Sequence, residues 1–449
     1  MRGGCLLSGF LLAALAGPLA AQINADGAPN DLRVVYRAAL DNNHRYQAAL
    51  DEYRATAEAK PQALARLLPR LSLEGQYNRI RRSIDGNFYG VQDVERDDIY
   101  NRYAYGASLL QPIYRRELLL GLDRAELEVS RARLRLTAAR HDLMVRSAEA
   151  YFGMLSAQDD LTLIRAEKAA IERQYEQTQG RFDSGLIAET DLQAVEAQRD
   201  SVLAEEIAAE NTVEIAQTRL ELLTGRSIER IAALPEDANL PPMENENLQS
   251  WLARADQHNL DLLAATVGLR LAELDTTIAR SARLPTLDLV GSHLYFDADD
   301  GVTGEREDED SRIGLMLTIP LYEGGMISSR VRQAQARAES QAHTTDGARS
   351  NARLATRTAF LNARSAHSRA NALVRAVDSA RSAEASAQVA FEVGSRTAAD
   401  YLGAVRARFS AERDLSRARY NYLLGLLRLR EAAGVVTVTD LENLNRTLQ

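Results

Sequence analysis

The side chains that most often carry out catalysis are scattered along this 449-residue chain. Its six histidines are dispersed, and none belongs to the His-Glu-x-x-His pair of a zinc enzyme. The sequence has no glycine-lysine loop for nucleotide phosphates and no Gly-x-Ser-x-Gly turn for a nucleophilic serine. It therefore predicts no catalytic residue, no metal site and no cofactor.

Acidic residues gather in one polar segment of the second half, between residues 297 and 310, where a calcium site is conceivable. These acids do not occupy the alternating positions of the helix-loop-helix calcium motif, which has a glycine sixth and a glutamate twelfth. We interpret the segment as a solvated loop that joins two strands.

Charged and small polar residues also surround two short turns that contain glycine. The first turn runs from Arg181 to Asp191 and the second from Phe391 to Asp400. On the residues alone, the charges are capping and surface charges of small energetic weight, and the glycines supply a positive φ at a helix C-terminus. Any further role depends on the elements that position these turns.

The two turns belong to an internal duplication of the whole chain. Leu32 and Pro69 recur 216 residues later as Leu248 and Pro285. Other positions recur at offsets of 208 or 209: Gly106 with Gly314, Gly185 with Gly394, Asp191 with Asp400, and Gly225 with Gly434. Units of this length exceed the periods of solenoid repeats, which are about 20 to 50 residues. The duplication predicts two copies of one large module in a single fold.

The N-terminus is predicted to be a signal peptide, because Arg2 precedes an apolar run that ends in small residues. Cys5, the only cysteine, would leave with it, so the mature chain from about Gln22 has no disulfide. No later apolar run reaches the roughly 18 residues of a membrane helix. The formal charge of −9 argues against nucleic acid as a partner.

Each copy is predicted to contain a helix, a β-hairpin and a long helical hairpin. Strands of about ten residues alternate apolar with small or polar residues, and flanking tyrosines fit a membrane barrel, although a pair of soluble hairpins remains open. Two heptad series on the long helix predict two neighbouring helices. The predicted divisions are a signal peptide at 1–21; repeat 1 at 22–225, with a β-hairpin at about 70–112 and a helical hairpin at about 115–224; a link at 226–247; repeat 2 at 248–434, with hairpins at about 286–320 and 325–433; and a tail at 435–449.

Five segments, together with the duplication, resemble the TolC family of outer-membrane channel proteins across essentially the whole mature chain. They are Leu67–Leu71 before the first strand, Arg181–Asp191 at the first turn, Pro320–Gly325 after the last strand, Phe391–Asp400 at the second turn, and Ala418–Leu423 in the last helix. The resemblance implies a mainly α fold with a β-barrel portion, in which the link and the tail form an equatorial belt.

The number of strands bears on the oligomer, because four strands cannot close a barrel and bacterial barrels have at least eight. Two copies with eight strands or three with twelve both satisfy this limit. The resemblance implies a homotrimer, with a twelve-stranded β-barrel in outer-membrane lipid and an α-barrel through the periplasm.

The resemblance also assigns roles to the turns. It implies that Asp400 forms an acidic ring at the pore constriction, where three-fold symmetry focuses potential and favours cations. The second acid that family members often carry one helical turn on is Gly403 here, so we expect one ring. The implied lock of hydrogen bonds and ion pairs comprises Arg396, Thr190, Asp191, Phe391 and Arg419. The implied adaptor-binding tips comprise Gly185, Leu186, Val393, Gly394 and Ser395.

The function implied by the resemblance is the outer-membrane exit duct of a tripartite system for multidrug efflux or type I protein secretion. A periplasmic adaptor and an inner-membrane transporter of the RND, ABC or MFS type would recruit and open it at the tips. A soluble periplasmic coiled-coil scaffold without a pore is the alternative, and it would leave the alternating strands unexplained.

Overall fold

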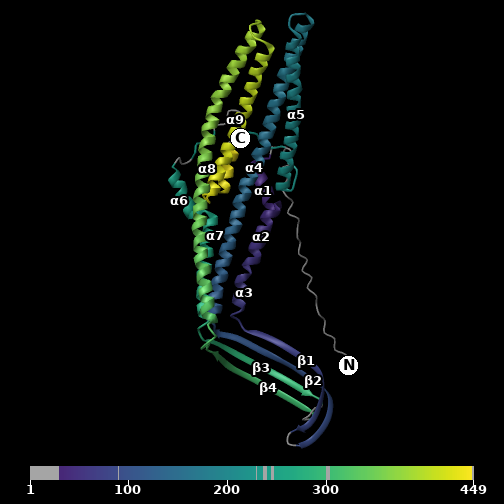
Figure 1. Ribbon diagram of the computed structural model, residues 1–449, viewed down its shortest axis with the longest axis vertical. Coiled ribbons are helices and arrows are strands. Elements are labelled where there is room, and N and C mark those ends of the chain that lie inside the picture. The colour runs from purple at the N-terminus through teal and green to yellow at the C-terminus, as the bar shows by residue number, and fades with distance from the viewer. Residues whose placement is uncertain are drawn as a thin grey trace, which may run out of the picture.

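The computed structural model describes residues 30–88, 91–228, 230–235, 240–243, 247–299 and 304–446, so the predicted signal peptide lies outside the described residues. A sheet forms one end of a long, narrow molecule, and helical hairpins form the other (Figure 1). The helices are α1 (Leu32–Asn42), α2 (His44–Ala57), α3 (Ala59–Ala65), α4 (Arg116–Asp183), α5 (Glu189–Thr224), α6 (Leu248–His258), α7 (Leu260–Ser281), α8 (Met326–Glu392), α9 (Ala398–Ala432) and α10 (Val438–Arg446). The strands are β1 (Arg70–Phe88), β2 (Val91–Tyr114), β3 (Thr286–Ala298) and β4 (Arg306–Thr318).

The duplication is visible in how the helices begin. Asn43 and Asn259, which lie 216 residues apart, cap α2 and α7 by accepting hydrogen bonds from backbone amides three residues on, at 3.1 and 3.0 Å. Asn43 also ends α1 because its backbone is extended, with φ −74° and ψ 110°. A second break at Glu58 separates α2 from α3, so the single helix expected before the first β-hairpin is three helices.

The four strands form one antiparallel sheet in the order β1-β2-β3-β4. Strand β2 of the first copy pairs with β3 of the second, so the two copies share the sheet. In a single chain, β1 and β4 are the two edges.

The strands differ from the expected length of about ten residues. Strands β1 and β2 contain 19 and 24 residues, because their ladder continues through polar residues beyond the apolar alternation. Strand β4 likewise begins at Arg306, so half of the predicted acidic loop is paired with β3. Backbone pairing maintains these strands where the alternation of apolar side chains has ended.

One face of the sheet is apolar and uncovered. Leu71 and Leu73 on β1, with Leu315 and Leu317 on β4, are all more than half exposed. Tyr105 stacks on Tyr295 across β2 and β3 with ring centres 4.7 Å apart on this same face. An exposed patch of this kind indicates a surface that contacts lipid or another protein.

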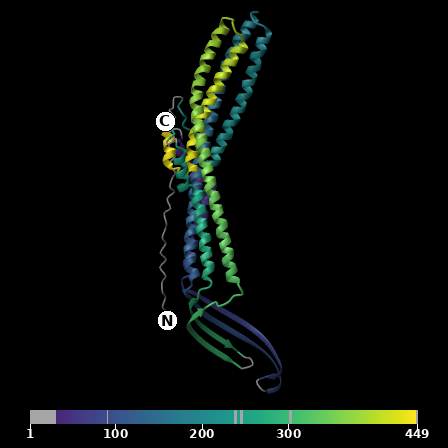
Figure 2. The ribbon, with the colours of Figure 1, turned by 60° about the vertical axis from the view of Figure 1, so that its left-hand side comes forward.

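Helix α4 contains 68 residues, which correspond to about 100 Å, and it runs through most of the bundle. It packs against α1, α2, α3 and α7 towards the sheet and against α5 and α9 towards the tips (Figures 1 and 2). In the described parts of the chain, no helix is both long and apolar enough to cross a membrane.

The main core lies near the middle of the bundle, where α1, α4, α9 and α10 meet. Tyr151, Phe152 and Leu423 are almost fully buried there. Trp251 is buried nearby, where it packs with Phe360 and Leu429.

Two glycines hold the hairpins against this middle region. Gly225 is the C-cap of α5 and Gly434 follows the C-cap of α9, with φ of +69° and +75°. A Cβ on Gly434 would lie 2.0 Å from the carbonyl oxygen of His258, and one on Gly225 would lie 2.8 Å from Cβ of Asn42. Because His258 follows Asn42 by 216 residues, the same close approach recurs in both copies.

Candidate functional site at the helical tips

The two tip turns have the same backbone geometry. Gly185 has φ +69° and Gly394 has φ +75°, and each follows the last turn of its long helix. The amide of Leu186 donates to the carbonyl of Arg181 at 2.9 Å, and the amide of Ser395 donates to Ala390 at 2.9 Å. Both are therefore glycine C-caps, in which the left-handed residue satisfies carbonyl groups at the helix end.

Asp400 is held by a capping box at the start of α9. Its amide donates to Oγ1 of Thr397 at 3.1 Å, while its carboxylate accepts from the amide and the hydroxyl of Thr397 at 3.2 and 2.8 Å. These hydrogen bonds, followed by the nearby charge of Arg396, lower the pKa of Asp400. The capped carboxylate therefore stays ionised at a pH where an ordinary aspartate begins to take up a proton.

The first tip lacks this arrangement. Ala188 occupies the N-cap of α5 and provides no side-chain cap. In the part of the chain that the structure describes, no hydrogen bond or ion pair is formed by the side chains of Thr190 or Asp191. The two copies thus share a backbone turn but differ in how their first acid is held.

Phe391 packs instead of forming the polar contacts expected of the lock, because its side chain has no polar atom. Its ring stacks on Tyr401 with centres 5.9 Å apart, and the guanidinium of Arg181 lies 4.7 Å from the ring centre. Since Arg181 lies in the last turn of α4 and Phe391 lies on α8, this cation–π contact joins the two helical hairpins.

The two arginines of the expected lock lie far apart. Arg396 is exposed at the second tip. Arg419 lies 19 residues beyond Asp400 on α9, about 28 Å along the helix axis. There it lines a cavity with Asp159 and Tyr420. The structure therefore brings Asp400, Arg396 and Phe391 to the second tip and Thr190 and Asp191 to the first, but it places Arg419 elsewhere.

The residues expected to contact an adaptor are accessible. Leu186 and Val393 are 74% and 73% exposed, and a Cβ on Gly185 or Gly394 would meet no atom within 4 Å. The hydroxyl of Ser395 donates to the carbonyl of Ala390 at 3.0 Å, so it also caps α8.

A polar seam between α4 and α9 was missed by sequence reasoning. Arg413 contacts the buried Glu167 at 2.6 Å, and Arg417 contacts Asp160 at 2.7 Å. Tyr420 and Ser416 both donate to Asp159, at 2.8 and 2.6 Å. Burial raises the pKa of Tyr420, so its hydroxyl keeps the proton that it donates. Heptad analysis follows apolar residues only, and pairing these charges requires knowledge of which helices are neighbours.

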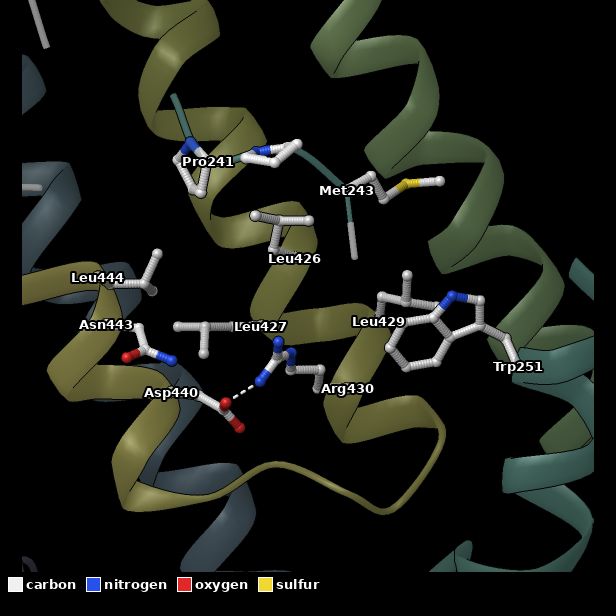
Figure 3. Close-up of a pocket in the computed structure, with 11 residues that line it drawn as sticks. Pro241, Met243, Trp251, Leu426, Leu427, Leu429, Arg430, Asp440, Asn443 and Leu444 are labelled. Carbon is white, nitrogen blue, oxygen red and sulfur yellow. Dashed lines mark ion pairs between the residues drawn. The ribbon is translucent and has the colours of Figure 1, made fainter. Parts of the chain in front are cut away.

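A cavity of about 230 Å³ lies at mid-length, where the link and the tail meet α6 and α9 (Figure 3). Trp251 and Leu429 form its apolar wall, and Arg430 is ion-paired with Asp440 beside it. Within the described residues there is no cluster of three or more acids, histidines or cysteines that could hold a metal.

Two β-hairpins with an uncovered apolar face, continued by two long helical hairpins, define one subunit of an outer-membrane channel. The chain belongs to the outer membrane efflux protein family, whose model matches residues 35–226 and 251–435. Its place is therefore the outer membrane of a Gram-negative bacterium, and the soluble scaffold is set aside.

Individual proteins agree with this assignment. The chain is 33% identical to "Outer membrane protein TolC" of Vibrio cholerae, covering 99% of this chain and 98% of that protein. It is 30% identical to "Alkaline protease secretion protein AprF" of Pseudomonas aeruginosa, covering 91% and 85%. The CmeC outer membrane channel of Campylobacter jejuni has the same fold, with a TM-score of 0.75 at 15% identity over 100% and 98% of the two chains.

The seam between α4 and α9 generates a stability prediction. Replacing Arg413 by Met leaves the Glu167 carboxylate, which is 1% exposed, without its partner. We expect a loss of about 3 to 5 kcal/mol, as for other broken buried pairs. Thermal unfolding followed by circular dichroism measures it. Arg165→Met removes the two ion pairs that this exposed arginine forms with Glu206 and Glu210, and it should change stability little. Equal effects of the two variants would contradict the importance of burial.

Proposed function

We propose that three copies of this chain form an exit duct through the outer membrane. The observation that carries the proposal is the sheet, which has two free edges and an exposed apolar face. Backbone groups at a sheet edge need partners in a bilayer, and three copies would supply them in a closed barrel of twelve strands. The six helical hairpins would continue the barrel as a periplasmic tunnel, with residues 226–247 and 435–449 in an equatorial belt.

The tips would form the gate of this duct. Three copies of Asp400 would make one ring of ionised carboxylates that favours cations. Gly403 supplies no second acid one turn on, so the constriction would have a single ring. Within the described chain, the side chains of Arg396, Thr190 and Asp191 form no hydrogen bond or ion pair, which leaves them available to neighbouring protomers. Phe391 would support the gate by packing. Arg419 would contribute its charge from α9, away from the tips.

The partners are proposed from the family and from the exposed tips. A periplasmic adaptor would contact Leu186 and Val393, with Gly185, Gly394 and Ser395 allowing close approach. The chain belongs to an efflux protein family, and one of its relatives is a protease secretion protein. The inner-membrane transporter would therefore be of the RND, ABC or MFS type. The proposal assigns transport rather than catalysis to the chain, with no cofactor.

The gate is tested by conductance. Arg396→Ser should raise single-channel conductance in planar bilayers, because it removes a charged group that holds the closed tips together. Arg54→Ser, which removes the same charge from an exposed position on α2, should leave conductance unchanged. Equal conductance of the Arg396 variant and the parent chain would refute the proposed lock.

The acidic ring is tested by pH. Because the pKa of Asp400 is lowered, cation selectivity should persist as the pH falls through about 4, the usual aspartate range, and disappear only below it. Thr397→Val removes the hydroxyl that donates to the carboxylate, so selectivity should disappear at a higher pH. Reversal potentials in asymmetric KCl measure both shifts.

The controls for this measurement are two variants. Ser395→Ala removes a neighbouring hydroxyl that bonds Ala390 instead, so it should leave the pH profile unchanged. Asp400→Ala should weaken cation selectivity at every pH. If selectivity survives that substitution, the ring lies elsewhere.

The adaptor contact is tested by photo-crosslinking in cells. A photoreactive residue at Leu186 or Val393 should form a covalent adduct with the periplasmic adaptor. Leu222 is 80% exposed but lies at the other end of α5, so the same residue there should form no adduct. Adducts from Leu222 alone would place the adaptor on the middle of the bundle instead.

A further inference from the structure

The junction between two protomers can be derived from the junction inside one chain. This inference rests on the proposed homotrimer, in which β4 of one protomer must pair with β1 of the next. Strand β4 repeats β2 at an offset of 208, and β3 repeats β1 at an offset of 216. The observed pairing of β2 with β3 is therefore a template for the pairing of β4 with a neighbouring β1.

The template fixes a register. In the chain, Arg102 lies opposite Ala298. The equivalent positions are Asp310 on β4 and Arg82 on β1, which places an acid opposite a base across the protomer boundary. Nearer the helices, Ser108 lies opposite Ser292 between β2 and β3. The equivalent pair between protomers is Met316 on β4 with Gln76 on β1.

The charges on the two edges are complementary around this position. Three of the four residues from Arg79 to Arg82 are arginines, and five of the six from Glu305 to Asp310 are acids. Arg82 is exposed, and the described residues provide it with no ion-pair partner. Asp308 is on the same face as Asp310, two residues along β4, so it would be a diagonal neighbour of Arg82.

Edge charges have a second interpretation, because they also prevent sheets from pairing edge to edge. Charges of either sign would serve that purpose on either edge. Here the two edges carry opposite signs, whereas the equivalent internal junction has an arginine opposite an alanine. Opposite charges also meet inside the chain, where Arg82 lies opposite Asp98 across β1 and β2, so the acids of β4 would flank Arg82 from its other side.

We propose that Arg82 of one protomer pairs with Asp310 of the next, forming a ring of three ion pairs at the end of the sheet farthest from the helices. The site is incomplete in the described part of one chain, where the ion-pair partner of Asp310 is Arg312 of its own strand, with Nε of Arg312 3.0 Å from Oδ1 of Asp310. Each pair fixes the register of one protomer boundary, because a shift by one residue would move the two charges to opposite faces.

Disulfide crosslinking tests the register in the full-length protein in the membrane. The only native cysteine is Cys5, so a chain with Arg82→Cys and Asp310→Cys reports on that pair. Oxidation should give covalent dimers and trimers on a non-reducing gel. Arg82→Cys with Arg306→Cys should give none, because four residues along a strand correspond to about 13 Å, beyond the Cα separation of a disulfide.

A second pair separates this inference from the homotrimer itself. Gln76→Cys with Met316→Cys lies in the same junction nearer the helices, away from the charges. If this pair crosslinks between protomers and the Arg82–Asp310 pair does not, the proposed ion pair is wrong while the trimer stands. If neither pair crosslinks, pairing of β4 with β1 fails, and the closed barrel fails with it.

A charge swap tests the ion pair. Arg82→Glu and Asp310→Arg should each lower the temperature at which the detergent-solubilised trimer dissociates, and the double variant should recover most of that loss. Raising the salt concentration should reduce the difference between the single variants and the parent chain. Single variants with unchanged dissociation temperatures, or a double variant no better than the worse single variant, would overturn the proposed pairing.

Discussion

The organisation of this chain depends on one constraint, the need of backbone amide and carbonyl groups for hydrogen-bond partners inside a bilayer. In a four-stranded sheet the backbone groups of the inner strands are hydrogen-bonded, whereas those along the two outer edges have no partner strand. Those edges, with an outward face that exposes Leu71, Leu73 and Leu315, make the isolated chain an incomplete membrane protein. Closure by identical copies satisfies the edges, and the helices must then follow the same symmetry around a common axis.

The duplication favours such closure, because each repeat supplies one β-hairpin and one helical hairpin of the same architecture. The caps at Asn43 and Asn259 and the close approaches at Gly225 and Gly434 are structural features that both repeats retain. The tips have diverged. Thr397 holds Asp400 in a capping box, whereas Ala188 leaves Asp191 without one. A shared backbone turn therefore presents two different acids, one with a fixed carboxylate and one without.

Sequence reasoning predicted the helical hairpins well because a period of about 3.6 residues persists over many turns, and α4 and α8 follow it for 68 and 67 residues. The predicted strands were too short because the alternation of apolar and polar side chains ends where both faces become polar. Backbone pairing between β1 and β2 nevertheless continues there. Among the tip residues, the glycine turns were identifiable from their type, whereas the stacking of Phe391 on Tyr401 depends on the neighbouring helix. The capping box had a local signal in the sequence, Thr397 followed by an acid three residues on.

The contacts between α4 and α9 show why a long, thin bundle needs polar groups in its seams. Buried alanines of α8 such as Ala352, Ala363 and Ala370 permit close approach of helices, but they are alike, so they define the register of packing weakly. A buried pair such as Arg413 with Glu167 contributes little net stability compared with apolar residues of the same volume, yet a slip of the helices would leave both charges unpaired. Charged seams between hairpins and a charged junction between protomers thus follow from the same requirement. Where apolar surfaces are repetitive, discrete charges select one alignment among many.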